Sequence, residues 1–364
     1  MHAPSRGLVC RHRSRSGIAW RARFDGLRRP EKRRNVIVVM TTVHAIRVHE
    51  TGGPDVLRWE SVELPEPGPG EVRVRHSAVG LNFIDVYRRT GLYAAPLPFT
   101  PGTEAAGVVE ALGAGVTRFA VGDRIVYAGG PLGAYAEARN IDASELVKIP
   151  SGIDESLAAA SLLKGMTAHY LVEIGRLEES PQTILVHAAA GGVGLLLCQW
   201  AKHYGATVIG AVGSEQKAKL ARENGCDEVI LYGREDVSKR IGEITKGKMV
   251  DVVYDSVGKD TFDGSLASLR PRGIMVSFGQ SSGAVPPFEP RLLAKGSLFF
   301  TRPVLGDYTA TREELEARAG DLFAALKDGT LKALVGQTYP LREAARAHRD
   351  LEGRKTTGST VLLP

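Results

Sequence analysis

The chain has 364 residues, which is long for one domain and sufficient for two. Hydrophobic residues make up 43% and charged residues 24%, as in ordinary soluble globular proteins, and no apolar run approaches the roughly 20 residues of a membrane span. Three cysteines (Cys10, Cys198 and Cys226) are too few and too scattered for a disulfide framework or a cysteine-rich zinc site, so we expect a protein of the reducing cytosol.

Residues 1–40 account for the net positive charge of the chain, with 11 lysines and arginines against two acidic residues. The rest of the chain carries 36 against 39 and is nearly neutral. Three interpretations stay open for this segment, which we expect to lack ordered structure: an organelle transit peptide, a basic arm for nucleic acid, or translation from a start codon upstream of a true start at Met40. We favour the third, because a strand pattern (VHAIRVHE) begins directly after Met40.

Residues 41–150 are predicted to be rich in β-strands. Apolar and polar residues alternate over 43–48 and over 71–80, which is the period of a half-buried strand. A turn cluster (ELPEPGPGE) lies between these two strands, and two more short strands separated by glycine turns lie within 103–127. Several short strands at close spacing indicate a small barrel.

The pattern then changes to an alternation of helices and strands. A helix is predicted over 154–175, and the alternation is regular from Thr183 onward, which indicates βαβ units and a parallel sheet. A long helix over 311–329 and a final strand over 358–364 follow. The strands of the parallel sheet are expected at 183–189, 207–213, 228–232, 250–258 and 273–280, with helices at 194–205, 214–225 and 238–247.

A glycine-rich turn follows the first strand of this sheet and opens the next helix. Aligned to the pattern GxGxxG, residues 189–194 read AAGGVG, with alanine at the first glycine position. Gly191 lets the backbone approach a pyrophosphate, and Gly194 permits close packing of helix and strand. The N–H groups at the helix start, those of Gly192 and Val193 included, then meet the anion. The position of the turn inside a βαβ unit favours a dinucleotide site.

The end of the second strand bears on which dinucleotide binds. NAD enzymes usually carry an acidic residue there, but this strand ends at Gly213 and Ser214, with Lys217 three residues on. An ammonium and a hydroxyl suit a 2′-phosphate, and Tyr232 at the end of the third strand could add a donor or cover the adenine. We therefore predict NADPH. The alternatives are that Lys217 is an ordinary surface lysine and that Tyr232 packs within the sheet.

Several longer motifs carry a family resemblance: GLNFIDVYRRTGLY, PGTEAAGVV, AVGDRIVY, LLKGMTAHYL, HAAAGGVGLLLCQWAKHYGA, VVYDSVGKDTF, MVSFGQSSGAV, KGSLFFTRP and GRKTTGSTVLLP. Over residues 41–364 the chain resembles the zinc-independent quinone oxidoreductases of the medium-chain dehydrogenase/reductase superfamily, the zeta-crystallin-like group. The resemblance implies an α/β protein with a GroES-like β-barrel domain and a Rossmann dinucleotide-binding domain. It also implies NADPH-dependent reduction of quinones.

Zinc-dependent members of the superfamily place a cysteine and a histidine in two of these motifs. The corresponding segments here read Phe83-Ile84-Asp85 and Gly102-Thr103-Glu104, and the lobe with four structural cysteines is missing. Without soft nitrogen and sulfur ligands we expect no metal site. The remaining histidines that we considered (His76, His169, His187 and His203) have no ligand spacing and are interpreted as isolated surface or packing residues.

The resemblance also implies the residues of the site. Asn82, Ile84, Asp85 and Tyr87 would border the nicotinamide and the quinone pocket, with Lys164 and Thr167 approaching from the domain junction. A quinone is already an electrophile, so these residues are expected to orient the reactants rather than to supply extensive acid–base chemistry. Further cofactor contacts are implied for Ser256, Phe278, Gly279, Gln280, Phe300, Thr301, Arg302 and Arg354, with Arg302 alternatively a structural residue and Lys355 an alternative to Arg354 at the phosphate.

We divide the chain into a basic extension (1–40), a catalytic barrel (41–164), an NADP-binding domain (165–303) and a C-terminal return to the catalytic domain (304–364). Relatives dimerise through the nucleotide domain by pairing the strand near GIMVSF, so a homodimer is expected.

Two other functions stay open beside quinone reduction. The first is NADPH-dependent reduction of enones or enoyl thioesters on the same scaffold. A thioester pocket needs cationic residues for the carrier phosphates, and Arg88 and Arg89 are the obvious pair near its mouth. The second is RNA binding through the basic arm, which we consider a minor alternative.

Overall fold

The structure is a computed structural model that describes residues 40–364. The three interpretations of the basic arm therefore lie outside the described residues. No helix of the described part has the length and apolar character that crossing a bilayer requires.

Strands of the first half of the described chain form two sheets, and the larger sheet also includes β14 and β15 from the C-terminal end. All pairs are antiparallel except β14 with β15, which is parallel. A two-stranded sheet pairs β1 with β2, and a larger one has the order β14-β15-β3-β4-β5-β7, with β6 paired to β3. The predicted strands at 43–48 and 71–80 are confirmed as β1 and β3. The strand bounds are β1 Met40–Arg47, β2 Arg58–Pro65, β3 Glu71–Leu81, β4 Glu104–Leu112, β5 Arg124–Ala128, β6 Ala138–Asp142, β7 Val147–Lys148, β14 Val335–Pro340 and β15 Ser359–Leu363.

Alternation along these strands builds one hydrophobic core. Val72 and Val74 of β3 face inward with Ile125 and Tyr127 of β5, all fully buried. Burial of apolar area stabilises the fold by about 25 cal/mol per Å². The helix α1 (Phe83–Thr90) leaves this core directly after β3. Asn82 and Asp85 start the helix through a capping box, so the motif GLNFID fixes where the helix begins.

The nucleotide domain is a six-stranded parallel sheet with the order β10-β9-β8-β11-β12-β13. This is the Rossmann order, and the direction of winding reverses between β8 and β11, which creates a ligand crevice at the carboxyl ends of the strands. The predicted fold class is thereby confirmed. The strand bounds are β8 Thr183–His187, β9 Thr207–Val212, β10 Glu228–Leu231, β11 Val250–Asp255, β12 Leu269–Ser277 and β13 Phe299–Thr301.

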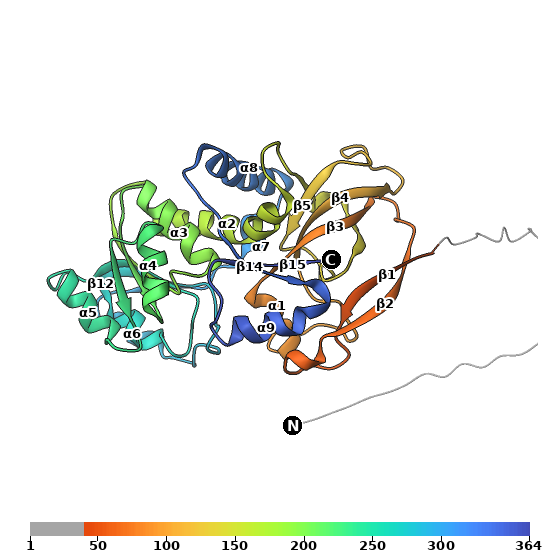
Figure 1. The fold of residues 1–364 in the computed structure, drawn as a ribbon. Coiled ribbons are helices and arrows are strands. Elements are labelled where there is room, and N and C mark those ends of the chain that lie inside the picture. Colours follow the sequence, from red (N-terminus) through yellow and green to blue (C-terminus); the bar gives the residue numbers. More distant parts are fainter. Residues whose placement is uncertain (1–39) are drawn as a thin grey trace, which may run out of the picture. The chain divides into compact units, whose positions relative to one another are not determined.

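Helices pack against the two larger sheets and connect the two domains. The long helix α2 packs against β3, β4 and β5 of the first domain and against α3 and α8 beyond it (Figure 1). Its first turn is capped by the Asp154 carboxylate, which accepts from the Leu157 N–H. The helix bounds are α2 Glu155–Gly175, α3 Gly192–His203, α4 Glu215–Glu223, α5 Val237–Ile244, α6 Phe262–Ala267, α7 Leu305–Tyr308, α8 Arg312–Asp328 and α9 Ala344–Glu352, with short 3₁₀ turns at Pro54–Val56, Ala143–Glu145, Pro290–Ala294 and Leu341–Glu343.

The position of GIMVSF in the nucleotide sheet bears on the expected dimer contact. The strand that contains GIMVSF is β12, and it pairs with β11 on one side and with β13 on the other. The two edge strands of the sheet are β10 and β13, and β13 is a three-residue strand whose Phe299 is 60% exposed. So short a strand shows no alternation that a sequence pattern could detect.

Candidate active site

The predicted pyrophosphate turn connects β8 to α3. Gly191 is the N-cap of α3, and no side chain of residues 40–364 caps the helix, so its first N–H groups are available to an anion. A Cβ on Gly194 would lie 2.4 Å from the Ala188 carbonyl oxygen, which makes glycine obligatory there. A Cβ on Gly192 would lie 2.7 Å from the side chain of Lys164. The turn therefore fits a pyrophosphate, and its backbone lies against a lysine of α2.

Four residues predicted for the adenosine phosphate come together at the end of β9. Ser214 caps α4, and Lys217 in the first turn of that helix donates from Nζ to the Arg354 carbonyl oxygen at 2.7 Å. Burial and the nearby Arg354 charge lower the pKa of Lys217. A Cβ on Gly213 would lie 2.4 Å from the Tyr232 hydroxyl, so Tyr232 also lies over this strand end. Two cations beside a hydroxyl suit a phosphate dianion.

A buried ion pair between β4 and α2 lies beside the turn. Glu104 of β4 is fully buried and accepts from Lys164 Nζ at 3.1 Å, Asn82 Nδ2 at 2.8 Å and the Leu163 N–H at 2.7 Å. Lys164 is only 6% exposed. The sequence analysis noted Glu104 only within the segment that lacks a zinc-binding histidine and missed its role in the ion pair, although a lone acid within the apolar run EAAGVV was a signal for a buried charge.

Asp85 lies in the same buried region, on the first turn of α1. Its Oδ2 accepts from the Asn82 N–H at 2.9 Å and from the Tyr135 hydroxyl at 3.0 Å. Burial raises the pKa of Asp85 to about 7, against the opposing effects of these two donors and the Lys164 charge. Oδ1 is also buried and has no hydrogen-bond partner within the described chain. A carboxyl with a pKa near neutrality is typical of a functional site.

Aromatic residues of the first domain reach the strand ends of the Rossmann sheet. The Gln280 N–H donates to the Tyr87 hydroxyl oxygen at 2.8 Å, and burial raises the pKa of Tyr87 to about 12. The Tyr93 ring meets the Tyr87 ring edge-on, and Arg302 Nη2 donates to the Tyr93 hydroxyl at 3.2 Å. Arg302 also donates to the Gly279 carbonyl oxygen at 2.8 Å. In this structure Arg302 therefore connects the two domains through neutral acceptors.

The other predicted residues lie on the same elements with less specific contacts. The Thr167 hydroxyl donates to the Leu163 carbonyl within α2, at 2.7 Å. The Phe300 ring packs against Phe262 and Phe288 in the core of the nucleotide domain. Ser256, Phe278 and Gln280 are half-buried after β11 and β12, Gly279 is buried, Ile84 is half-buried on α1, Val193 packs on the main core, and Thr301 ends β13.

The expected pair of arginines at the mouth of the substrate pocket is wrong. Arg89 is 1% exposed and cannot form a cationic pair with Arg88 at the surface. The Arg89 side chain instead turns inward, where it meets His348 and Glu352 of α9. Amphipathic spacing on so short a helix did not separate the two neighbouring arginines.

Three of the four histidines considered above take part in packing contacts. His76 contacts the Tyr127 hydroxyl, His187 contacts Ser265, and His169 contacts Arg318. Among residues 40–364, no three histidine, cysteine or acidic side chains are grouped so that they could hold a metal ion.

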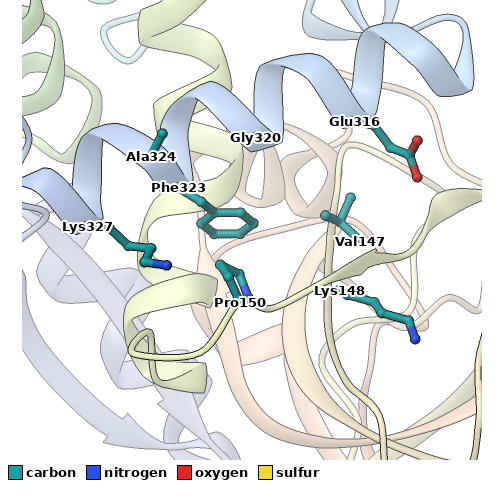
Figure 2. A pocket seen from close by; sticks show the side chains of 8 residues that line it. All are labelled: Val147, Lys148, Pro150, Glu316, Gly320, Phe323, Ala324 and Lys327. Atoms are coloured by element: carbon teal, nitrogen blue, oxygen red, sulfur yellow. The ribbon is translucent and has the colours of Figure 1, made fainter.

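A surface pocket of about 350 Å³ lies apart from this site, between α8 on one side and β7 with the residues that follow it on the other. Figure 2 shows the Phe323 ring beside Pro150, with Lys327 at one end and Lys148 at the other. None of the predicted site residues lines it.

Comparisons with known proteins agree with the two-domain fold. Residues 68–151 match the family model described as alcohol dehydrogenase GroES-like domain, and residues 192–324 match the one described as zinc-binding dehydrogenase. The quinone oxidoreductase of Pseudomonas aeruginosa is 53% identical over 86% of this chain and 97% of its own, and a 2-haloacrylate reductase of Burkholderia is 47% identical over 88% and 99%.

A solved structure extends the likeness to three dimensions. The Escherichia coli quinone oxidoreductase complexed with NADPH matches with a TM-score of 0.86 and 48% identity, over 89% of this chain and 100% of that one. Identity of this extent over nearly full-length relatives establishes the family. The chain therefore belongs to the quinone oxidoreductases of the medium-chain dehydrogenase/reductase superfamily.

Proposed function

We propose that this protein reduces quinones with NADPH and without zinc. The observation that carries the proposal is the hydrogen bond from the Gln280 N–H to Tyr87, because it brings an aromatic wall to the crevice where a Rossmann fold holds its nucleotide. A planar acceptor lying against Tyr87 and Tyr93 would face a nicotinamide bound at that strand end. The NADPH supplies the hydride, and the protein orients the reactants and excludes water.

The proposed binding residues follow the contacts described above. The turn Gly191–Gly194 binds the pyrophosphate, and Ser214, Lys217 and Arg354 bind the 2′-phosphate, with Tyr232 over the adenosine. The nicotinamide lies between the two domains, where Asn82 and Tyr87 can contact the acceptor. The full proposed set around it is Asn82, Ile84, Asp85, Tyr87, Lys164, Thr167, Ser256, Phe278, Gly279, Gln280, Phe300, Thr301 and Arg302.

The test is steady-state NADPH oxidation by the purified full chain with 1,4-benzoquinone and 9,10-phenanthrenequinone. We expect turnover with both quinones, slower turnover with NADH, and no loss of rate after treatment with a metal chelator. Loss of rate on chelation, restored by zinc, would overturn the zinc-free proposal. Absence of turnover with any quinone would overturn the function itself.

Reduction of an activated carbon–carbon double bond is the second candidate. It is favoured by the 47% identity to a 2-haloacrylate reductase, and 2-chloroacrylate and a simple enone belong in the same assay. The thioester version is weakened because Arg89 is buried and cannot meet a carrier phosphate. Turnover of the acrylate or enone without turnover of quinones would replace the first proposal by this one.

Exchanging Lys217 for glutamate should change the cofactor preference. An acidic side chain repels the 2′-phosphate and accepts from a ribose hydroxyl. We expect the ratio of kcat/KM for NADPH to that for NADH to fall by about tenfold to a hundredfold, the worth of one or two charged hydrogen bonds. Lys219→Glu is the matched control, because Lys219 lies on the same helix with a side chain that is 80% exposed. Equal ratios in the two variants would contradict the assignment of Lys217.

Assembly and location are also proposals. The free edge strand β13 with exposed Phe299 and the neighbouring Val304, both 60% exposed, supports a homodimer formed by pairing β13 with its copy. Light scattering of the full chain should then give twice the mass of one chain.

Cys198 and Cys226 are free thiols 3.5 Å apart, which supports a reducing compartment such as the cytosol.

A further inference from the structure

A row of buried side chains connects Asp85 to the C-terminal helix α9. Arg89 Nη1 lies 3.1 Å from His348 Nδ1, His348 Nε2 lies 3.0 Å from the Tyr135 hydroxyl oxygen, and that oxygen lies 3.0 Å from Asp85 Oδ2. All four side chains are at most 1% exposed. They come from α1, the segment between β5 and β6, and α9, which lies beside α1 (Figure 1).

The donor and acceptor chemistry of these groups fixes the direction of each hydrogen bond in the row. A guanidinium has no acceptor, so His348 Nδ1 must accept from Arg89 and the ring must carry its proton on Nε2. His348 then donates to the Tyr135 oxygen, and the single Tyr135 hydrogen goes to Asp85. Burial, together with the Arg89 charge, lowers the pKa of His348 to about 3, and burial first of all raises that of Tyr135 well above its usual value, so neither changes protonation near neutrality.

The far end of the row is fixed as well. Arg89 Nε donates to the Gly52 carbonyl oxygen at 3.0 Å, and Nη2 donates to the Glu352 carboxylate at the end of α9. Glu352 is the most accessible member, with 29% of its side chain exposed. Arg89 is held by three hydrogen-bond partners. Its fixed guanidinium therefore orients His348, and His348 in turn orients Tyr135.

Asp85 connects this row of hydrogen bonds to the first turn of α1. Its carboxylate holds the Asn82 N–H, and the same helix carries Tyr87, which meets Gln280 of the nucleotide domain. The other charged groups that face Asp85 are Lys164 on α2 and Glu104 on β4, with opposite effects on its ionisation.

We propose that Arg89 and His348 are positioning residues of the quinone site: through Tyr135 they keep a hydrogen-bond donor on Asp85 and so hold Asn82 and Tyr87 at the start of α1. The proposal rests on the proposed function, since only that function gives Asn82 and Tyr87 a role in turnover. Arg89 and His348 themselves need not touch substrate or cofactor.

The experiment compares two buried tyrosines of the same domain. Tyr135→Phe removes the donor to Asp85, whereas Tyr127→Phe removes a buried hydroxyl that also meets a histidine, His76, but does not reach Asp85. Infrared difference spectra of the full chain across pH 5–9 follow the protonated carboxylic acid of Asp85, assigned by its absence in Asp85→Asn. The pH profile of kcat/KM with 1,4-benzoquinone is measured on the same proteins.

We expect the titration midpoint of Asp85 to move up by about 0.5–1 pH unit in Tyr135→Phe, the worth of one hydrogen bond, and kcat/KM to fall about fivefold to tenfold. Tyr127→Phe should leave both unchanged. His348→Gln should retain most of the wild-type behaviour, because its amide can accept from Arg89 and donate to Tyr135, whereas His348→Leu should resemble Tyr135→Phe.

Identical midpoints in the two tyrosine variants would overturn the proposal, as would identical behaviour of His348→Gln and His348→Leu. If His348→Leu does not fold, the tyrosine pair decides alone. Failure of the proposed function is separate from these results: a full chain that reduces no quinone overturns the function, while the infrared midpoints still decide whether His348 and Tyr135 act on Asp85.

Discussion

Replacing Glu104 with alanine is expected to lower the free energy of unfolding by about 3–5 kcal/mol, the usual cost of leaving one partner of a buried ion pair alone. The variant would leave the ammonium of Lys164 buried without its carboxylate. It would also leave the Leu163 N–H without its acceptor and the Asn82 amide with only the Gly80 carbonyl oxygen at 3.4 Å. Urea unfolding monitored by circular dichroism measures the change.

Two further variants test this explanation of the loss. In Glu104→Leu combined with Lys164→Met both charges are gone, so we expect a smaller loss than in Glu104→Ala, because no isolated charge is left. Glu179→Ala is the control for an exposed pair, since Arg176 and Glu179 are 71% and 60% exposed. It should change stability by less than about 1 kcal/mol. A Glu104→Ala protein within 1 kcal/mol of wild type would contradict the buried pair.

The second large effect is a loss of stability in acid that passes through His348. Burial is the main cause that lowers the pKa of His348 to about 3, below the 6.5 of an exposed histidine. Between these two pKa values the unfolded chain therefore binds a proton on His348, whereas the folded chain does not. The stability this histidine contributes is fully present above pH 6.5 and is lost as the pH falls toward 3, at about 1.4 kcal/mol per pH unit. His76, whose pKa burial lowers to about 4, acts in the same direction.

The measurement compares wild type with His348→Gln between pH 6.5 and pH 4. We expect the stability difference between the two proteins to change by about 3 kcal/mol over this interval in favour of the variant. Asp85→Asn provides a control of opposite sign, because burial raises the pKa of Asp85 from 3.8 to about 7, and its contribution to stability is fully present below pH 3.8 and is lost as the pH rises from there to 7. That variant should become relatively less stable as the pH falls. Parallel curves for wild type and His348→Gln would contradict a buried neutral histidine.

The sequence predicted the large elements of the fold but not the shortest strands. The regular alternation from Thr183 gave the nucleotide domain, because buried parallel strands and their helices have distinct lengths and periods. The strands that the sequence analysis missed are β2, β6, β7, β13 and β14. Their short or partly exposed segments carry little periodicity, and only pairing with distant strands makes them strands.

The site was predicted in part, and the missing part has a common cause. The turn at Gly191–Gly194 could be derived from the residues, because the steric demands of a glycine are local. Arg354 lies 137 residues from Lys217, and only the family resemblance brought the two together before the structure did. Glu104, Tyr135 and His348 were missed because each is a single polar residue in an ordinary segment. Their importance arises from partners that the topology supplies.

The placement of β15 has a consequence for how the protein is made. This strand inserts between β14 and β3, the Gly358 N–H donates to the Ala190 carbonyl beside the pyrophosphate turn, and the Ser359 hydroxyl donates to the Ala160 carbonyl of α2. The ribosome therefore translates nearly all strands of the two larger sheets before it reaches the segment that contacts the turn. The nascent nucleotide domain can form its sheet early, but the crevice stays incomplete until residues 358–363 have left the exit tunnel.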